Sequence, residues 1–259
     1  MDRNPFLPRL YPISEAVSIE DYLADLVDEL GEAFSFSYDA DASATNIGVT
    51  INSLSFHAGG ESLATFSGSG NLTLSETGIH GEITLSLDAG PSLAGLSLTV
   101  SEASFNLDTR EGTQWSVVLD GALEFGDGYA ISGAIQLRHL NDPDQVGAKL
   151  VLVDVSSGSL ILGNVAQPFT LNGATGRFLF SQSGLFGDGE VDVDLQLDSF
   201  SLNGTFGMTV NTFNGALSKT LIIDGEQTTI SAEAGPSYEI LATNAELEIL
   251  NNTISGSYG

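Results

Sequence analysis

The sequence contains no cysteine, so disulfides, thiolate metal ligands and a cysteine nucleophile are excluded. It has only seven lysines and arginines against 34 acidic residues, which gives a formal net charge of −27. Such a charge repels phosphate backbones and anionic lipid head groups, and we therefore expect no nucleic-acid partner. An acidic surface of this kind suits a salty or calcium-containing medium, where counterions screen the repulsion within the chain.

Long apolar runs are also missing, and no stretch is long enough to cross a membrane as a helix. The first twelve residues contain three prolines and no continuous apolar segment, so they do not have the pattern of a signal peptide. The apolar fraction of 42% is nevertheless enough to build a core. We therefore predict a folded chain rather than a disordered one.

One amphipathic helix is predicted near the N-terminus. Apolar side chains recur there at helical spacing, at Ile19, Tyr22, Leu23, Leu26 and Leu30. Acidic residues fall mainly on the opposite face, and Gly31 provides a stop signal. We expect residues 1–31 to form an arm and a helix that caps the first edge of the region that follows.

From residue 32 to 259 the apolar pattern changes to a period of two, which indicates β-strands. Val191, Val193 and Leu195 alternate with polar residues, as is typical of antiparallel sheets with one face in the core. Two short segments, 150–153 and 221–223, are continuously apolar and are predicted to be buried on both faces. The predicted fold class is therefore all-β and antiparallel.

Three landmarks recur along this region. Predicted strands that start with glycine begin at Gly70, Gly121, Gly173, Gly204 and Gly256, at intervals of roughly fifty residues with one of roughly thirty. Ala-Gly-Pro-Ser occurs at 89–92 and 234–237, and Phe-Gly-Asp-Gly occurs at 125–128 and 186–189. Together they predict about four degenerate units, over residues 64–120, 121–172, 173–203 and 204–259.

Repeats of this kind predict an elongated antiparallel β array, either solenoid-like or made of stacked sheets. Each unit would bury its apolar face against its neighbours. Because the sequence stops where a further unit would start, we expect it to be one end of a longer array with an open edge.

Calcium binding is predicted for the acidic turns. The candidate ligands are Asp39, Asp41, Asp127, Asp142, Asp144 and Asp188. Calcium requires several oxygen ligands, which acidic turns between strands can supply. No EF-hand or nonapeptide calcium motif is present, and aspartate and glycine are also the residues that tight turns require.

Catalytic signals are weak. The three histidines, His57, His80 and His139, have no metal-ligand spacing, and no nucleophile elbow occurs. Trp115 is the single tryptophan and could stack on a sugar, but such a residue is more often a core anchor. We predict that the chain is not an enzyme and has no required cofactor, with Ca²⁺ as the one candidate ion.

The last predicted unit carries a resemblance. Its segments Gly204-Thr-Phe-Gly-Met-Thr-Val-Asn, Ala234-Gly-Pro-Ser-Tyr and Ile254-Ser-Gly-Ser-Tyr are similar to β-rich repeats of very large bacterial surface or secreted proteins of adhesin type. The resemblance implies an extracellular or cell-surface location and a role as stalk, scaffold or adhesin segment. It carries over no functional residue.

Three functions follow as hypotheses. The first is a non-enzymatic structural or interaction module, with neighbouring repeats, surface glycans or proteins as partners. The second is an apolar β-groove that binds or conducts hydrophobic or lipid cargo, as in the β-taco proteins of bacterial lipid transport. The third is a carbohydrate-binding domain that uses Trp115.

Overall fold

The computed structural model describes residues 22–24, 26, 30–38, 46–58, 61–92, 95–110, 114–125, 129–144, 148–162, 169–181, 184–197, 200–223, 226–249 and 252–258. These residues form fifteen strands. They are β1 (Phe34–Ser37), β2 (Asn46–Ala58), β3 (Glu61–Ser75), β4 (Gly78–Ala89), β5 (Leu96–Asp108), β6 (Gln114–Phe125), β7 (Tyr129–Asn141), β8 (Lys149–Leu162), β9 (Phe169–Ser181), β10 (Gly184–Leu197), β11 (Phe200–Asn211), β12 (Leu217–Ile223), β13 (Glu226–Ala232), β14 (Ser237–Ile249) and β15 (Asn252–Tyr258).

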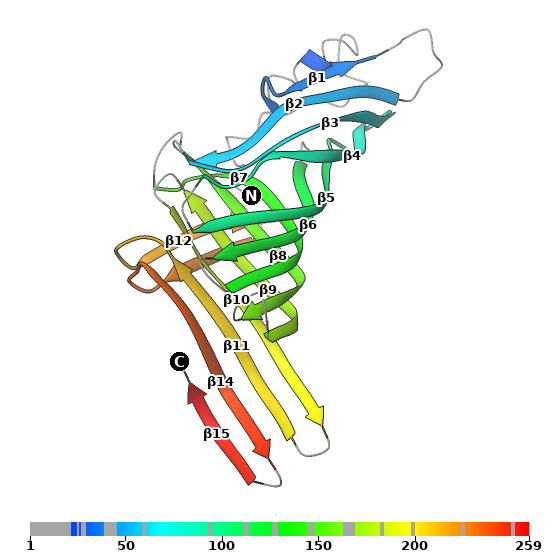
Figure 1. The fold of residues 1–259 in the computed structure, drawn as a ribbon. Coiled ribbons are helices and arrows are strands. Elements are labelled where there is room, and N and C mark those ends of the chain that lie inside the picture. Colours follow the sequence, from blue (N-terminus) through cyan, green and yellow to red (C-terminus); the bar gives the residue numbers. More distant parts are fainter. Residues whose placement is uncertain are drawn as a thin grey trace. The chain divides into compact units, whose positions relative to one another are not determined.

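Thirteen of these strands form one sheet in the order in which the chain makes them (Figure 1). The sheet runs from β1 through β11 and then to β14 and β15, while β12 and β13 pair only with each other. Every strand pair whose register is described is antiparallel. The predicted all-β antiparallel class is confirmed, whereas solenoid-like stacking is not. In the described part of the chain, no helix has the length and apolar character needed to span a membrane.

Compact packing divides the chain into two units, which are described separately. The first comprises residues 1–55, 65–89 and 102–118, and the second comprises residues 56–64, 90–101 and 119–259. Strands β2, β3, β5 and β6 contribute residues to both units.

The first unit has an aromatic centre. The ring of Phe34 lies 5.0 Å from that of Phe105 and 6.3 Å from that of Trp115. The rings of Phe105 and Trp115 are 5.9 Å apart. Phe34 and Phe105 are buried. Trp115 therefore packs as an anchor within this ring cluster, which is the core interpretation that the sequence left open.

The predicted N-terminal helix is described only in part. Tyr22, Leu23 and Leu26 are helical and buried, so the apolar positions of the predicted helix do enter the core of the first unit. The hydroxyl groups of Tyr22 and Thr109 are joined by a buried hydrogen bond of 2.7 Å. The other residues of the predicted helix, Ala24 and Leu30 apart, lie outside the described residues, and a complete capping helix is not confirmed.

In the second unit the sheet curls around a packed inner face. The rings of Phe125 in β6 and Phe178 in β9 are 5.3 Å apart, and both residues are buried. Three strand steps separate these strands, which would span about 14 Å in a flat sheet. A side chain at Gly189 of β10 would likewise meet the Ile131 side chain of β7 at 3.0 Å. Large apolar side chains thus fill the inside of the curl.

The hairpin β12–β13 covers the opposite face of the same strands (Figure 1). Its buried residues pack on β8, β9 and β10 in one apolar cluster, which contains Leu150, Leu152, Leu179, Phe186, Leu221, Ile223, Ile230 and Ala232. This second layer explains why residues 150–153 are all buried, as the sequence predicted. The matching prediction for 221–223 is wrong, because Ile222 points outward and is 73% exposed.

The glycine landmarks lie within strands rather than at their beginnings. Gly70, Gly121 and Gly204 are interior residues of β3, β6 and β11. The two Ala-Gly-Pro-Ser segments, by contrast, run from the end of β4 into the following connection and from the connection after β13 into β14. The predicted boundaries of the four units are not tested by this arrangement and stay a prediction.

Candidate functional site

Two of the six predicted calcium ligands come together, and they hold a lysine. The Nζ atom of Lys219 in β12 donates hydrogen bonds to Asp142 Oδ1 at 2.8 Å and to Asp144 Oδ2 at 2.5 Å. The backbone N–H of Asp144 also donates to Asp142 Oδ1 at 2.9 Å, which fixes the turn after β7. The pair of carboxylates therefore binds an ammonium group that arrives from the hairpin.

Burial makes this ion pair more than a surface contact. The side chains of Lys219 and Asp142 are 15% and 7% exposed, whereas that of Asp144 is 66% exposed. The pKa of Lys219 is raised, because its two carboxylate partners together outweigh the desolvation that lowers it. The ammonium group is thus held charged, and it ties the hairpin to the turn after β7.

Three of the remaining calcium candidates, Asp39, Asp41 and Asp127, lie outside the described residues. Among the residues that are described, no group of three histidine or acidic side chains could hold a metal ion. The calcium prediction therefore stays a prediction, and at Asp142 and Asp144 the oxygen atoms already bind Lys219.

Asp188 was predicted in a turn, and that prediction is wrong. It is a residue of β10, directly opposite Arg177 of β9 and Thr209 of β11. The pKa of this exposed carboxyl is raised by partial desolvation and by the like charge of Glu190, while Arg177 opposes the shift.

Gly187, the residue before Asp188, is glycine because the neighbouring strand leaves no room for a side chain. A side chain at Gly187 would collide with the carbonyl oxygen of Arg177, and its φ of 154° is unusual for other residues.

Arg177 belongs to a second ionic cluster that joins three strands. Its Nε lies 3.2 Å from Oδ2 of Asp154 in β8, and Nη2 of Arg138 in β7 lies 3.6 Å from the same oxygen.

In the first unit, Arg110 makes a two-point contact with Asp108 at 3.0 and 2.6 Å. That contact is the main reason that the pKa of Asp108 falls from 3.8 to about 2. Arg110, Arg138, Arg177 and Lys219 are thus all paired with aspartates.

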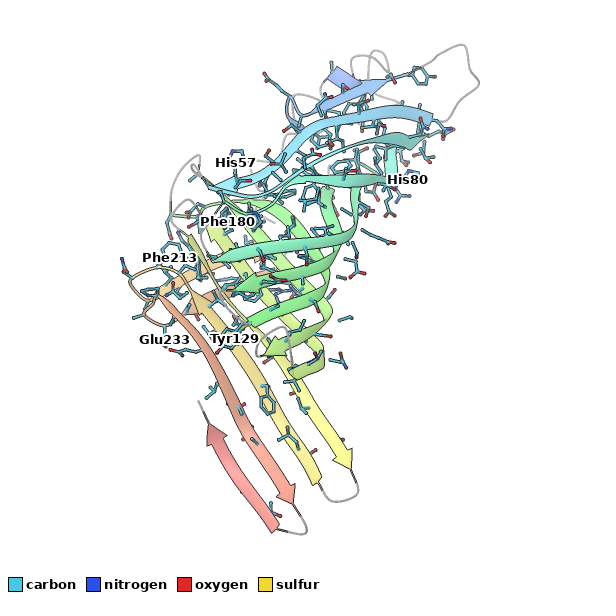
Figure 2. The ribbon with its side chains drawn as sticks, viewed as in Figure 1. His57, His80, Tyr129, Phe180, Phe213 and Glu233 are labelled. Atoms are coloured by element: carbon cyan, nitrogen blue, oxygen red, sulfur yellow. The ribbon has the colours of Figure 1, made fainter. Side chains whose placement is uncertain are left out.

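The histidines occupy three different strands, and Figure 2 labels two of them, His57 and His80. His57 is exposed near the end of β2, and His139 in β7 packs its ring 4.9 Å from that of Phe56. His80 lies in β4 opposite Asp108. This distribution gives no common centre for acid–base chemistry among the three.

One buried polar residue organises the base of the hairpin, and the sequence did not single it out. Asn211 is completely buried at the end of β11. Its Nδ2 donates to the carbonyl oxygens of Gly215 at 2.9 Å and Glu233 at 2.5 Å, and its Oδ1 accepts from the Phe213 N–H at 2.9 Å. It therefore joins the segments that enter and leave β12–β13, and Figure 2 shows Phe213 and Glu233 beside this hairpin.

The geometry defines a class of protein: an open, curled antiparallel sheet with a covering hairpin, whose charged side chains connect strands to one another. Comparison of the chain with protein-family models, with curated proteins and with solved structures finds no match. A function of the chain is therefore inferred from its described residues alone.

Proposed function

We propose that this chain is a non-enzymatic structural or interaction module of a large extracellular repeat protein. The observation that carries the proposal is the sheet itself, in which thirteen strands are added almost entirely in chain order. Within the described residues, a sheet built in this way has an edge strand at each end, β1 and β15. Open edges are the part of a β-sheet that pairs with further strands.

The use of charged residues supports the same proposal. The four cations Arg110, Arg138, Arg177 and Lys219 neutralise aspartates between or within neighbouring elements. Charges used in this way hold a scaffold together. The large acidic excess on the rest of the chain suits a calcium-containing or salty medium outside the cell.

Surface labelling of intact cells that make the protein tests this proposal. An antibody against residues 1–259 should label unpermeabilised cells, and external protease should remove the signal. A cytoplasmic protein should serve as the control that stays protected. Labelling that requires permeabilisation would contradict the proposed location and role.

A groove for hydrophobic cargo is the second candidate. On the inner face of β10 and β11, Val191 and Met208 are buried, but Val193 and Phe206 further along are only half-buried. The apolar face of the sheet thus continues beyond the part that is packed. Mass spectrometry of the purified protein under native conditions would show bound lipid if this surface carries cargo, and a lipid-free spectrum would count against it.

A further inference from the structure

The sequence contains three asparagine–glycine pairs, and the fold places them in two different settings. They are Asn172-Gly173, Asn203-Gly204 and Asn214-Gly215. The first two pairs lie within strands β9 and β11, whereas the third lies in the loop that leads from β11 into β12. Glycine has no side chain to shield its backbone nitrogen. The side-chain amide of an asparagine that precedes glycine can therefore be attacked by the next backbone nitrogen.

Strand pairing restrains the first two pairs. Asn172 lies directly opposite Ser159 of β8, and its Oδ1 accepts a 2.8 Å hydrogen bond from the Ser159 hydroxyl. Asn203 of β11 lies between Asp194 of β10 and Glu246 of β14. An extended backbone directs the side chain away from the peptide groups of its own strand. The side-chain amide of either asparagine meets the next backbone nitrogen only after the sheet opens locally.

Asn214 has the opposite setting. Asn214 and Gly215 are both exposed in a bend between β11 and β12. A carbon atom added at Gly215 would meet nothing within 4 Å, so the space around its backbone is open. The loop can therefore bring the side-chain amide of Asn214 against the Gly215 nitrogen without any loss of strand pairing.

We propose that Asn214 is a site of self-modification, where asparagine converts to aspartate and isoaspartate and the base of the covering hairpin is loosened. The backbone nitrogen of Gly215 loses its proton to a base in solution and bonds to Cγ of Asn214. The bond from Cγ to the side-chain nitrogen then breaks. That nitrogen takes up a proton and leaves as ammonia, and a five-membered succinimide ring remains.

One water molecule then opens the ring in one of two ways. Attack on Cγ breaks its bond to the Gly215 nitrogen and gives aspartate. Attack on the backbone carbonyl carbon breaks the original peptide bond and gives isoaspartate, in which the main chain continues through the side chain. The net change is the exchange of ammonia for water, and no oxidant or cofactor is consumed.

The position of the site gives the conversion a structural effect. The buried Nδ2 of Asn211 donates to the Gly215 carbonyl oxygen at 2.9 Å, and it also donates to the carbonyl oxygen of Glu233 at the other end of the hairpin. An isoaspartate link lengthens the main chain directly before Gly215. The carbonyl group of Gly215 is thereby displaced from Asn211, and β12–β13 loses one of the attachments at its base.

The test follows the full chain by mass spectrometry during incubation in warm, mildly alkaline buffer. Each conversion raises the mass by about 1 Da, and fragmentation of peptic peptides assigns it to one asparagine. In the folded protein, Asn214 should convert at least about tenfold faster than Asn172 or Asn203. In concentrated urea, where the strands are lost, all three pairs should convert at similar rates.

Gly215→Ala is the matched variant, because its methyl group shields the backbone nitrogen while the open space around it leaves the fold intact. It should slow conversion at Asn214 at least about tenfold and leave the circular dichroism spectrum unchanged. After incubation, amide hydrogen exchange in β12–β13 should become faster in the wild type and stay unchanged in Gly215→Ala. The comparison separates the loosened hairpin from general damage during incubation.

Four results would each overturn the proposal. They are absence of conversion at Asn214, conversion of Asn172 or Asn203 at the same rate in the folded protein, equal rates in the wild type and Gly215→Ala, and unchanged hydrogen exchange in the converted protein. The reaction needs only the loop and water, so its outcome is independent of the proposed cell-surface role.

Discussion

At the scale of single residues, this protein depends on a few buried polar groups that connect distant parts of the chain. Asn211 and Lys219 both act at the covering hairpin, the first through neutral hydrogen bonds and the second through charge. A buried polar group with all its partners contributes modestly, but removal of one partner leaves the others unsatisfied at a larger cost. These two residues are therefore sensitive sites for stability.

Replacement of Asn211 by alanine should lower the free energy of unfolding by about 3 kcal/mol, because it leaves the carbonyl oxygens of Gly215 and Glu233 without their donor. Urea titration followed by circular dichroism measures the change. Asn214→Ala is the control, since Asn214 is exposed in the same loop and should change stability by less than about 0.5 kcal/mol. Equal effects of the two substitutions would refute this role of Asn211.

Lys219→Met should lower the free energy of unfolding by about 2 kcal/mol at pH 7, because Asp142 is left buried without its cation. The pKa of Lys219 is higher in the folded protein, so its stabilisation is complete below the ordinary value of 10.5 and is lost as the pH rises through the folded-state value. The difference between wild type and variant should thus be constant from pH 7 to 9 and shrink above pH 10.5.

Arg110→Met serves as the control for Lys219→Met. Arg110 and Asp108 form an ion pair in which both side chains are more than 40% exposed (45% and 43%), so the loss should be below about 1 kcal/mol. A Lys219 variant that is as stable as the Arg110 variant, or a difference that does not respond to alkaline pH, would show that the Lys219 pair does not hold the hairpin.

At the scale of elements, the β12–β13 hairpin is the feature that distinguishes one face of the sheet from the other. Leu221 and Ile222 are neighbours in its sequence but differ completely in burial, at 5% and 73% exposed. We expect Leu221→Ala to cost about 2–3 kcal/mol of unfolding free energy and Ile222→Ala to cost less than about 0.5 kcal/mol. Thermal unfolding of the two variants provides the comparison, and similar melting temperatures would mean that the hairpin does not pack as described.

The strand pairs β4–β5 and β10–β11 provide a second prediction at this scale. A side chain at Gly78 would approach Thr109 Oγ1 to 2.6 Å, and one at Gly184 would collide with Thr212 Oγ1. Gly78→Ala and Gly184→Ala should therefore each destabilise the protein by at least about 1 kcal/mol. Gly215→Ala is the control, because nothing lies within 4 Å of its added carbon atom. A neutral result at either glycine would contradict this packing.

Local patterns predicted the strands well because burial of one face leaves a direct mark on the sequence. Residues 150–153 were predicted to be covered on both sides, and they are. Residues 221–223 carry the same apolar signal, but Ile222 faces outward because a two-stranded hairpin has only one face against the sheet. A local pattern cannot show whether a second layer exists on the other side.

The contacts at the candidate site were harder to predict, because they join residues far apart in the sequence. Lys219 and Asp142 are 77 positions apart, and no local pattern marks them as partners. Asp188 was placed in a turn because glycine flanks it on both sides. In the structure, Gly187 is present because the β9 backbone passes too close for a side chain. Glycine is required wherever a side chain would clash or the backbone needs a positive φ, and both a tight turn and a crowded strand meet this condition.

At the scale of the whole chain, the repeat of roughly fifty residues stays a prediction, and what the structure adds is that Gly81, Gly133 and Gly187, all with positive φ, lie in strands three apart in the sheet. The glycine-led alignment included Gly204, which lies in β11, outside this series. Repetition was thus visible in the sequence, but its phase required the strand order.

If the sheet is built from interchangeable three-strand steps, a tandem duplication of one step should fold as part of the same sheet. An additional copy of residues 133–186 is inserted after Phe186, which preserves the phase because Gly133 and Gly187 are equivalent. Leu150 and Leu152 of the upstream copy are replaced by threonine, because the hairpin after β11 would cover the added copy, whose strands then lie next to β11. The control insertion has the same composition in scrambled order.

Urea unfolding of these two proteins is the decisive measurement, since its m value scales with the surface exposed on unfolding. We expect one cooperative transition for the duplication, with an m value raised by roughly a fifth in proportion to the added residues. The scrambled insert should leave the m value unchanged and be cleaved readily by protease. An in-phase duplication that behaves like the scrambled control, or that prevents folding, would show that the three-strand steps are not interchangeable.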